Sequence, residues 1–202
     1  MLNRFRAFWT KVISPVAHLF LKLGISPDTV TLVGTLGVCA GALIFFPRGQ
    51  LLVGVLVITA FVFSDLVDGH MARLSGQSSK WGAFLDSTLD RLGDAAIFGG
   101  LAMYYVGPGA SDGFAALAIY CLVMGSVTSY ARARAESLGM EAKGGIAERA
   151  DRLVAILAMT GLSDIFNLPV LVPITLGLLA VASTVTVVQR ILAVRSQAKA
   201  VV

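Results

Sequence analysis

Six long apolar stretches, separated by short polar breaks, dominate this chain. We place them near residues 29–47, 51–74, 83–106, 113–137, 148–164 and 169–194. Each stretch is long enough, or nearly so, to cross a hydrocarbon core of about 30 Å as an α-helix, and the fifth is the shortest. The pattern predicts an all-α polytopic membrane protein with six transmembrane helices, which form one membrane domain over residues 25–202.

The first part of the chain follows a different pattern. Apolar side chains recur there at helical spacing, and Arg4, Lys11, His18 and Lys22 fall between them. This alternation is typical of an amphipathic helix that lies on an anionic membrane surface. Packing of the same helix on the protein's own body fits equally well. We predict an N-terminal interfacial helix over residues 1–24.

The composition agrees with a membrane location. The 202 residues are 56% hydrophobic and the mean hydropathy is +0.82, which is far too apolar for a soluble domain. Basic residues are unevenly placed: if the N-terminus lies inside, the outer loops contain Arg48 and the inner segments contain the other fifteen of the 16. This positive-inside pattern predicts that the polar turns near 74–82 and 138–147 face the cytoplasm, with the protein in the cell membrane.

Five carboxylates lie where the second and third apolar stretches meet. Asp65 and Asp68 are three residues apart, and Asp86, Asp90 and Asp94 follow at intervals of four. These intervals put side chains on one face of a helix, so two helices joined by a short turn would face each other across the acids. Oxygen-only ligands favour hard cations such as Mg²⁺ or Mn²⁺. We therefore predict a site for two such ions.

Ordinary helix-end charge is the alternative explanation for these acids. An aspartate at a helix N-terminus is favourable because it interacts with the helix dipole, which would account for Asp86 alone. Asp65 and Asp68 lie near the C-terminal end of an apolar helix, where anions are disfavoured. A functional site explains them better.

Small residues and an arginine are interleaved with the acids. Gly69, Ala72 and Arg73 follow the first pair, and Gly82 precedes Asp86 by four residues. Glycines let a ligand approach the backbone closely, and an arginine can pair with a phosphate. The pattern D-x2-D-G-x2-A-R-x8-G-x3-D-x3-D resembles the signature of the CDP-alcohol phosphatidyltransferase family, and every position of it is filled here.

The resemblance implies a metal-dependent transferase that acts on CDP-diacylglycerol. The implied metal ligands are Asp65, Asp68, Asp86 and Asp90. The implied CDP-diacylglycerol contacts are Asp28, Thr31, Gly69, Arg73 and Gly82. Asp90 is also implied to be the general base. Asp94 lies one turn past the signature, and we expect it to contact the metal-coordinating residues rather than the metal ions themselves.

A second polar cluster follows the fourth apolar stretch, over residues 126–152. Arginines that lie partly within membrane helices need a partner, and basic residues outnumber the nearby acids here, which suits an anionic ligand. We expect this role for Arg132, Arg152 and Arg190. Anchoring to lipid headgroups is the better explanation for Arg134, Lys143 and Arg195.

Three strings resemble one branch of the family, the actinobacterial phosphatidylinositol-phosphate synthases. They are SPDTVTLVGT (26–35), SYARARAE (129–136) and GGIAERADR (144–152). This resemblance implies an inositol-phosphate pocket beside the metals, formed by Ser129, Arg132, Arg152 and Arg190. The implied reaction joins CDP-diacylglycerol to inositol phosphate and releases phosphatidylinositol phosphate and CMP.

Two alternatives stay open. A glycerol-phosphate acceptor would give phosphatidylglycerol phosphate, and a basic pocket alone does not separate the two acceptors. A divalent-metal transporter would also use acids in membrane helices, but it would leave the glycines and the arginine of the signature without a role. The expected partners are the two substrates and membrane lipids, with a homodimer implied by the resemblance and no nucleic acid.

Overall fold

The computed structural model describes residues 14–76 and 79–200, apart from the side chains of Asp65 and Leu66. This part of the chain is helical and contains no strand. Its elements are α2 (Pro27–Phe45), the 3₁₀-helix η1 (Phe46–Arg48), α3 (Leu51–Val62), α4 (Ser64–Ser75), α5 (Lys80–Val106), α6 (Asp112–Ser137), α7 (Arg149–Ile165) and α8 (Leu171–Ala200). The all-α prediction is confirmed, and each predicted stretch coincides with one helix or with two consecutive helices.

The helices begin where side chains can satisfy the first free backbone N–H groups. The Ser26 hydroxyl accepts a hydrogen bond from Thr29 N at 3.1 Å, directly before α2, and the Ser79 hydroxyl accepts one from Gly82 N at 2.9 Å before α5. Glu148 and Asp151 form a reciprocal capping box at the start of α7. Such caps stabilise a helix by about 1 kcal/mol each, and they define where each polar turn ends.

The second apolar stretch differs from the prediction of one uninterrupted helix. It forms α3 and α4, with a turn at Phe63 between them. The Ser64 hydroxyl donates to Phe61 O at 2.6 Å and so competes with the regular backbone pattern at this point. The signature residues of α4 therefore lie on a short helix of their own.

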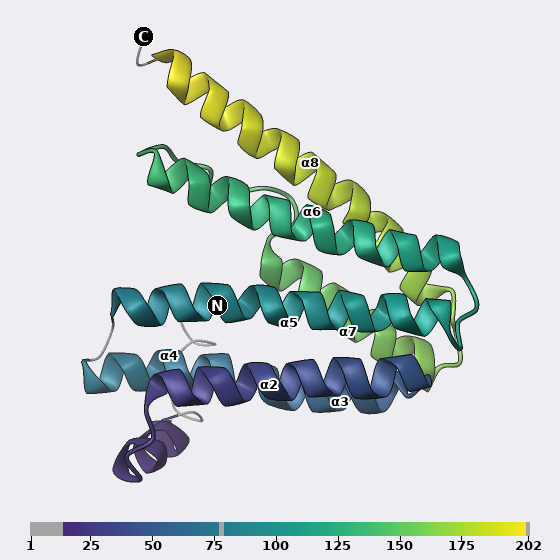
Figure 1. Ribbon diagram of the computed structural model, residues 1–202, viewed down its shortest axis with the longest axis horizontal. Helices are drawn as coiled ribbons and strands as arrows, with labels where there is room; N and C mark the ends of the chain where they lie inside the picture. Colours follow the sequence, from purple (N-terminus) through teal and green to yellow (C-terminus); the bar gives the residue numbers. More distant parts are fainter. Residues whose placement is uncertain (1–13, 77–78, 201–202) are drawn as a thin grey trace.

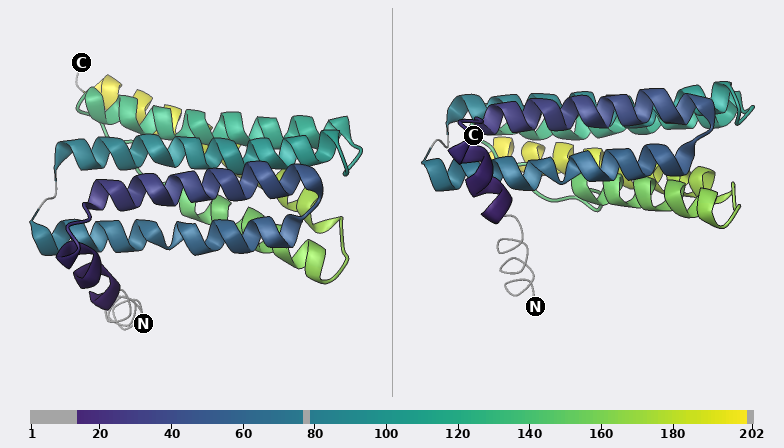
Figure 2. Two further views of the ribbon diagram at one scale, coloured as in Figure 1. Left: turned by 60° about the horizontal axis from the view of Figure 1, so that its bottom comes forward. Right: turned by 90° about the horizontal axis from the view of Figure 1, so that it is seen from below.

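The helices close into a ring. α2 packs against α3 and α5, α5 against α6, α6 against α8, α8 against α7, and α7 against α3 (Figures 1 and 2). The apolar core inside the ring includes Phe46, Ile58, Phe98 and Leu101. Gly100 allows α5 to approach α2, because a Cβ atom there would lie only 2.7 Å from the carbonyl oxygen of Ala42.

The two ends of the ring differ. The turns α2–α3, α5–α6 and α7–α8 lie at one end, and the end of α4, the start of α5 and the end of α8 lie at the other (Figure 1). Towards the second end, α6 and α8 diverge from the layer that contains α2 and α5 (Figure 1). Polar and charged residues of the signature and of α6–α8 gather at this end.

Four helical segments of the described chain are long and apolar enough to cross a membrane by length and composition. They are Pro27–Arg48, Leu51–Ser75, Asp112–Ser137 and Leu171–Ala200. Charged residues in the first half of α5 make it more polar than these four, and α7 has only 17 residues. The chain is therefore a helical protein of membrane character, and the count of six spans stays a prediction.

The N-terminal segment is described from residue 14 onward, and residues 14–22 are helical. Ala17 is fully buried and packs with Val30 of α2 and Met71 of α4. The Ser14 hydroxyl and the His70 ring nitrogen Nε2 are hydrogen-bonded at 2.8 Å. These contacts fit packing on the protein's own body, while the rest of the predicted interfacial helix, residues 1–13, lies outside the described residues.

Candidate active site

A cavity of about 260 Å³ opens where α2, α4 and α5 meet. We call it the signature cavity, because all five residues predicted to contact CDP-diacylglycerol line it. They are Asp28, Thr31, Gly69, Arg73 and Gly82. Asp68 and Asp86, two of the predicted metal ligands, line the same cavity. Residues up to 58 positions apart in sequence, from Asp28 to Asp86, are thus brought together by the packing of three helices.

Asp68 is the buried acid of the signature cavity, with 6% of its surface exposed. The Thr31 hydroxyl on α2 donates its one proton to Asp68 Oδ2, and its oxygen also lies 3.1 Å from the carbonyl oxygen of Pro27, the alternative acceptor. Thr31 therefore orients an acid of the signature, which adds a contact to the role that the sequence predicted for it.

Glycine keeps the signature cavity open on the side of α5. A Cβ atom at Gly82 would lie 3.4 Å from the Ser79 hydroxyl and 3.6 Å from Asp28 Oδ1, and so would occupy the space between α5 and α2. A Cβ atom at Gly69 would lie 3.7 Å from Arg73 Nη1, so the glycine leaves space beside that guanidinium. A phosphate-bearing ligand needs this space and this cation.

A second and larger cavity, of about 970 Å³, lies among α5, α6, α7 and α8. We call it the basic cavity. All four predicted acceptor residues line it: Ser129, Arg132, Arg152 and Arg190. Asp90 lines it as well, and Ala83 lines both cavities. The two cavities are therefore neighbours along α5.

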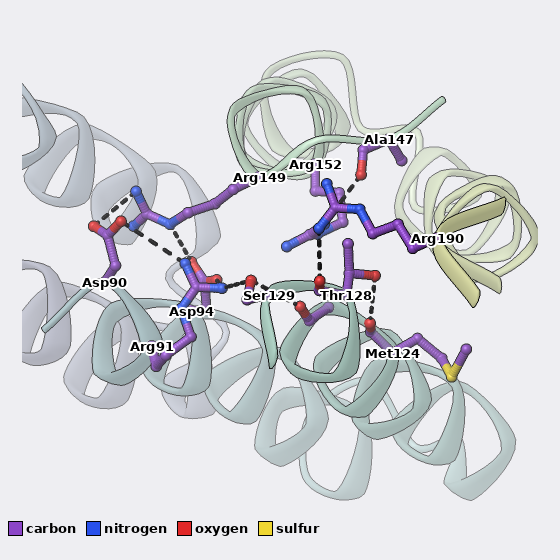
Figure 3. Close-up of polar contacts among 11 residues, drawn as sticks. Asp90, Arg91, Asp94, Met124, Thr128, Ser129, Ala147, Arg149, Arg152 and Arg190 are labelled. Carbon is purple, nitrogen blue, oxygen red and sulfur yellow. Dashed lines mark hydrogen bonds and ion pairs between the residues drawn. The ribbon is translucent and has the colours of Figure 1, made fainter. Parts of the chain in front are cut away.

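Arg152 and Arg190 are buried, with 2% and 5% of their surfaces exposed, and main-chain carbonyl groups hold them. Arg152 Nη1 donates to Ala147 O at 3.1 Å, and Arg190 donates to Thr128 O at 2.6 Å (Figure 3). Arg190 also donates to Gly144 O at 3.1 Å. Carbonyl groups orient a guanidinium without neutralising it. Arg152 Nη2 is buried without a hydrogen-bond partner in the described chain, so it has a donor to spare for a ligand.

Arg132 lies in a different environment. It is exposed, and its Nε atom is 3.0 Å from Glu136 Oε1, one turn along α6. Its charge is therefore already balanced by a neighbour. The structure brings Arg132 to the rim of the basic cavity, but it leaves Arg152 and Arg190 as the stronger candidates for an anion.

Asp90 and Asp94 share a network with two arginines that the site prediction did not include. Arg149 Nη1 lies 2.8 Å from Asp90 Oδ1, and Arg149 Nε lies 3.0 Å from Asp94 Oδ1 (Figure 3). Arg91 lies 3.4 Å from Asp94, and it also donates a hydrogen bond to Ser129. Two signals were available in the sequence: Arg91 stands between the two acids, and Arg149 precedes Arg152 by three residues.

The predicted metal ligands divide between the two cavities. Asp68 and Asp86 line the signature cavity, Asp90 lines the basic cavity, and the side chain of Asp65 is outside the description. Among the described side chains, no three acids, histidines or cysteines form a ready cluster for a metal. The donors are nevertheless carboxylate and hydroxyl oxygens, which fit hard divalent ions, so the four-acid set stays a prediction.

The fold is that of a helical protein of membrane character, and its described signature residues line two neighbouring cavities. The family model for CDP-alcohol phosphatidyltransferases matches residues 24–188, and the chain belongs to this family of transferases. It is 53% identical to the phosphatidylinositol phosphate synthase of Streptomyces avermitilis, over 98% of this chain and 84% of that protein. The synthase of Cutibacterium acnes is 52% identical, over 96% of this chain and 98% of its own length.

Crystal structures of a relative have the same fold. The Mycobacterium tuberculosis phosphatidylinositol phosphate synthase with CDP-DAG bound matches with a TM-score of 0.87 at 40% identity, over 91% of this chain and 94% of that chain. The complex of the same enzyme with manganese and citrate matches with a TM-score of 0.84 at 40% identity, over 90% and 88% of the two chains.

Proposed function

We propose that this chain is a phosphatidylinositol phosphate synthase. It transfers the phosphatidyl group of CDP-diacylglycerol to inositol phosphate and releases CMP. The observation that carries the acceptor assignment is the pair Arg152 and Arg190. Both are buried and line the cavity that Asp90 also lines, and carbonyl groups rather than carboxylates hold them. The names of the relatives from Streptomyces and Cutibacterium support the same acceptor.

CDP-diacylglycerol occupies the signature cavity in this proposal. Arg73 contacts a phosphate, Gly69 and Gly82 leave space for the nucleotide, and Asp28 and Thr31 border it. Asp65, Asp68, Asp86 and Asp90 hold two Mg²⁺ or Mn²⁺ ions, whose charge, when bound, neutralises the pyrophosphate and polarises the phosphorus under attack. The manganese complex of the Mycobacterium enzyme supports a divalent metal.

The inositol phosphate binds in the basic cavity through its own phosphate. Arg152, Arg190, Arg132 and Ser129 surround that phosphate, which places the free hydroxyl groups of the acceptor towards Asp90. One hydroxyl oxygen forms a bond to the β-phosphorus, its proton passes to the Asp90 carboxylate, and the bond between phosphorus and CMP breaks. Positioning and charge neutralisation contribute most to reactions of this kind, so a weakly basic carboxylate suffices.

The membrane arrangement completes the proposal. Six helical segments span the cell membrane, the N-terminal helix lies at its surface, and residues 25–202 form the membrane domain. Both cavities face the cytoplasm, where the positive-inside pattern places the α4–α5 turn. Two copies of the chain form a homodimer.

Product analysis tests the acceptor directly. The purified protein in detergent receives CDP-diacylglycerol and Mg²⁺, with either inositol phosphate or glycerol phosphate. We expect phosphatidylinositol phosphate and CMP from the first mixture and much less product from the second. Phosphatidylglycerol phosphate as the preferred product would overturn the acceptor and leave the family assignment intact. If no CMP is released with either acceptor, the result would contradict both the proposed acceptor and the expected transferase activity.

A further inference from the structure

Four charged side chains join α5 to α7 beside the basic cavity. Asp90, Arg91 and Asp94 belong to α5, and Arg149 is the first residue of α7. We call them the α5–α7 quartet. Their two positive and two negative charges balance, so the quartet adds no net charge for binding an anion. Its function must therefore be sought in geometry rather than in attraction of the substrate.

Arg149 contacts both acids of the quartet at once. Its Nη1 atom lies 2.8 Å from Asp90, and its Nε atom lies 3.0 Å from Asp94 (Figure 3). The two acids are one helical turn apart, about 6 Å. A planar guanidinium presents donors on two edges and can span this distance, whereas the compact ammonium of a lysine cannot.

Asp94 is the buried member of the quartet. Its side chain is 8% exposed, compared with 21% for Asp90 and 29% for Arg149. Of the described quartet residues, Asp90, Arg91 and Arg149 line the basic cavity and Asp94 does not. A buried carboxylate in contact with two arginines holds them in place, because losing either contact would leave part of its charge without compensation away from water. Asp94 therefore acts through its neighbours.

We propose that Asp94 and Arg149 are positioning residues for the transfer reaction. Asp94 holds the Arg149 guanidinium, Arg149 holds the Asp90 carboxylate through Oδ1, and Arg91 lies 3.8 Å from Asp90 Oδ2. Together these contacts set the orientation of the Asp90 carboxylate. The inference rests on the proposed role of Asp90 in receiving the acceptor's proton. Arg91 links the quartet to the predicted acceptor site, because it contacts Asp94 and donates a hydrogen bond to Ser129. A small displacement of such a group is costly for the rate.

Kinetics of three variants test this role. Asp94→Asn and Arg149→Gln should each lower kcat about 10- to 100-fold, with the KM for CDP-diacylglycerol unchanged. The double variant should be no slower than the slower single variant, because both residues act through one contact. Glu141→Gln and Lys143→Gln are the matched controls. They break an exposed ion pair of 2.9 Å in the loop before α7 and should leave kcat unchanged.

Binding of Mn²⁺, followed by the resonance signal of the free ion, separates positioning from loss of structure. Arg149→Gln removes a positive charge beside Asp90, so Mn²⁺ should bind as tightly as to the unmodified protein or more tightly. A variant that had merely lost its fold would bind the ion less well. The inference is overturned if both single variants keep their kcat, if their losses multiply in the double variant, or if Mn²⁺ affinity falls together with kcat.

The same measurements distinguish this inference from the proposed function. If the unmodified protein prefers glycerol phosphate, the inositol-phosphate assignment fails. The kcat values measured with glycerol phosphate then decide the positioning role by the same criteria.

Discussion

Two kinds of arginine line the basic cavity, and they differ in what each guanidinium contacts. Arg149 and Arg132 face carboxylates, whereas Arg152 and Arg190 face carbonyl oxygens. Only the second kind keeps a full charge for a ligand, because a carbonyl dipole orients a cation without cancelling it. Burial increases the difference, since charge–charge attraction is stronger where water is excluded.

Substitution of Arg152 or Arg190 should therefore weaken acceptor binding selectively. A charge-assisted hydrogen bond to a phosphate is worth about 1.5–3 kcal/mol. Arg152→Gln and Arg190→Gln should thus raise the acceptor KM about 10- to 100-fold, with a much smaller change in the KM for CDP-diacylglycerol. Steady-state kinetics with each substrate varied in turn measures both constants.

Lys143→Gln and Arg195→Gln are suitable controls for these variants, because both residues are exposed. Neither control should change either constant. If the KM for the lipid rises as much as the acceptor KM in Arg152→Gln, the buried arginines serve headgroup binding or folding instead.

The acids of the signature cavity allow a second test with single residues. Asp68→Asn keeps the size of the side chain and the Thr31 contact but removes a negative charge from the proposed metal site. We expect CMP release to be lost and Mn²⁺ binding to weaken, while the protein still folds and inserts. Asp112→Asn is the control, because Asp112 is an exposed acid at the far end of the ring and should be neutral. Normal turnover in Asp68→Asn would contradict the metal mechanism.

At the scale of elements, the loop between α6 and α7 depends on α8. The Thr186 hydroxyl accepts from Ala147 N at 3.1 Å, and Arg190 donates to Gly144 O. Further along α8, Gln197 accepts from Glu141 N at 2.8 Å and donates to Glu141 O at 2.6 Å. The loop thus has little structure of its own, and α8 determines the path that it follows past the basic cavity.

Gly145 is the tightest point of this contact. Its φ angle is +132°, and a Cβ atom there would lie 2.2 Å from the Thr186 methyl carbon. Gly145→Ala should therefore displace the loop and cost about 1–3 kcal/mol of stability through backbone strain alone. Raised acceptor KM and a lower unfolding temperature in detergent are the expected results.

A second variant separates the steric clash with the Thr186 methyl group from the backbone strain at position 145. Thr186→Ser removes the methyl group but keeps the hydroxyl that binds Ala147 N, so it should be benign alone. Combined with Gly145→Ala, it should recover part of the lost acceptor binding. A double variant as impaired as Gly145→Ala alone would mean that the contact with α8 does not position the loop.

At the scale of the whole molecule, the ring has two chemically different ends. The turns α2–α3, α5–α6 and α7–α8 lie at one end, and the end of α4, the start of α5 and the end of α8 lie at the other (Figure 1). The first three turns carry few charges, whereas Asp68, Asp86 and Asp90 line the two cavities. In a membrane this asymmetry predicts the orientation, because basic residues tend to stay on the cytoplasmic side.

Labelling of intact cells tests that orientation. A membrane-impermeant thiol reagent should modify Ala110→Cys, in the exposed α5–α6 turn, and should not modify Lys143→Cys until the cells are opened. The unmodified chain is the control, since Cys121 is buried and Cys39 lies within α2. Labelling of Lys143→Cys in intact cells would contradict the proposed topology.

The fold was largely predictable because its signals are local. Apolar runs of membrane length, capping serines before α2 and α5, and turns rich in polar residues determine where helices begin and end. The break at Phe63 escaped prediction, since one serine hydroxyl interrupts a run that is apolar throughout. The family followed from the spacing of the signature, and the family model confirms it.

By itself, the sequence determined the helical membrane class and the family. It also predicted which residues carry the chemistry, because helix geometry converts fixed spacings into shared faces. Only the tertiary structure decided how those residues are partnered. It divides the acids between two cavities, and it pairs Arg149 with Asp90 and Asp94 across 59 and 55 positions of sequence. In addition, Arg152 and Arg190 donate hydrogen bonds to main-chain carbonyl oxygens rather than to carboxylates. The charge left for a ligand depends on such contacts between helices, and no local spacing encodes them.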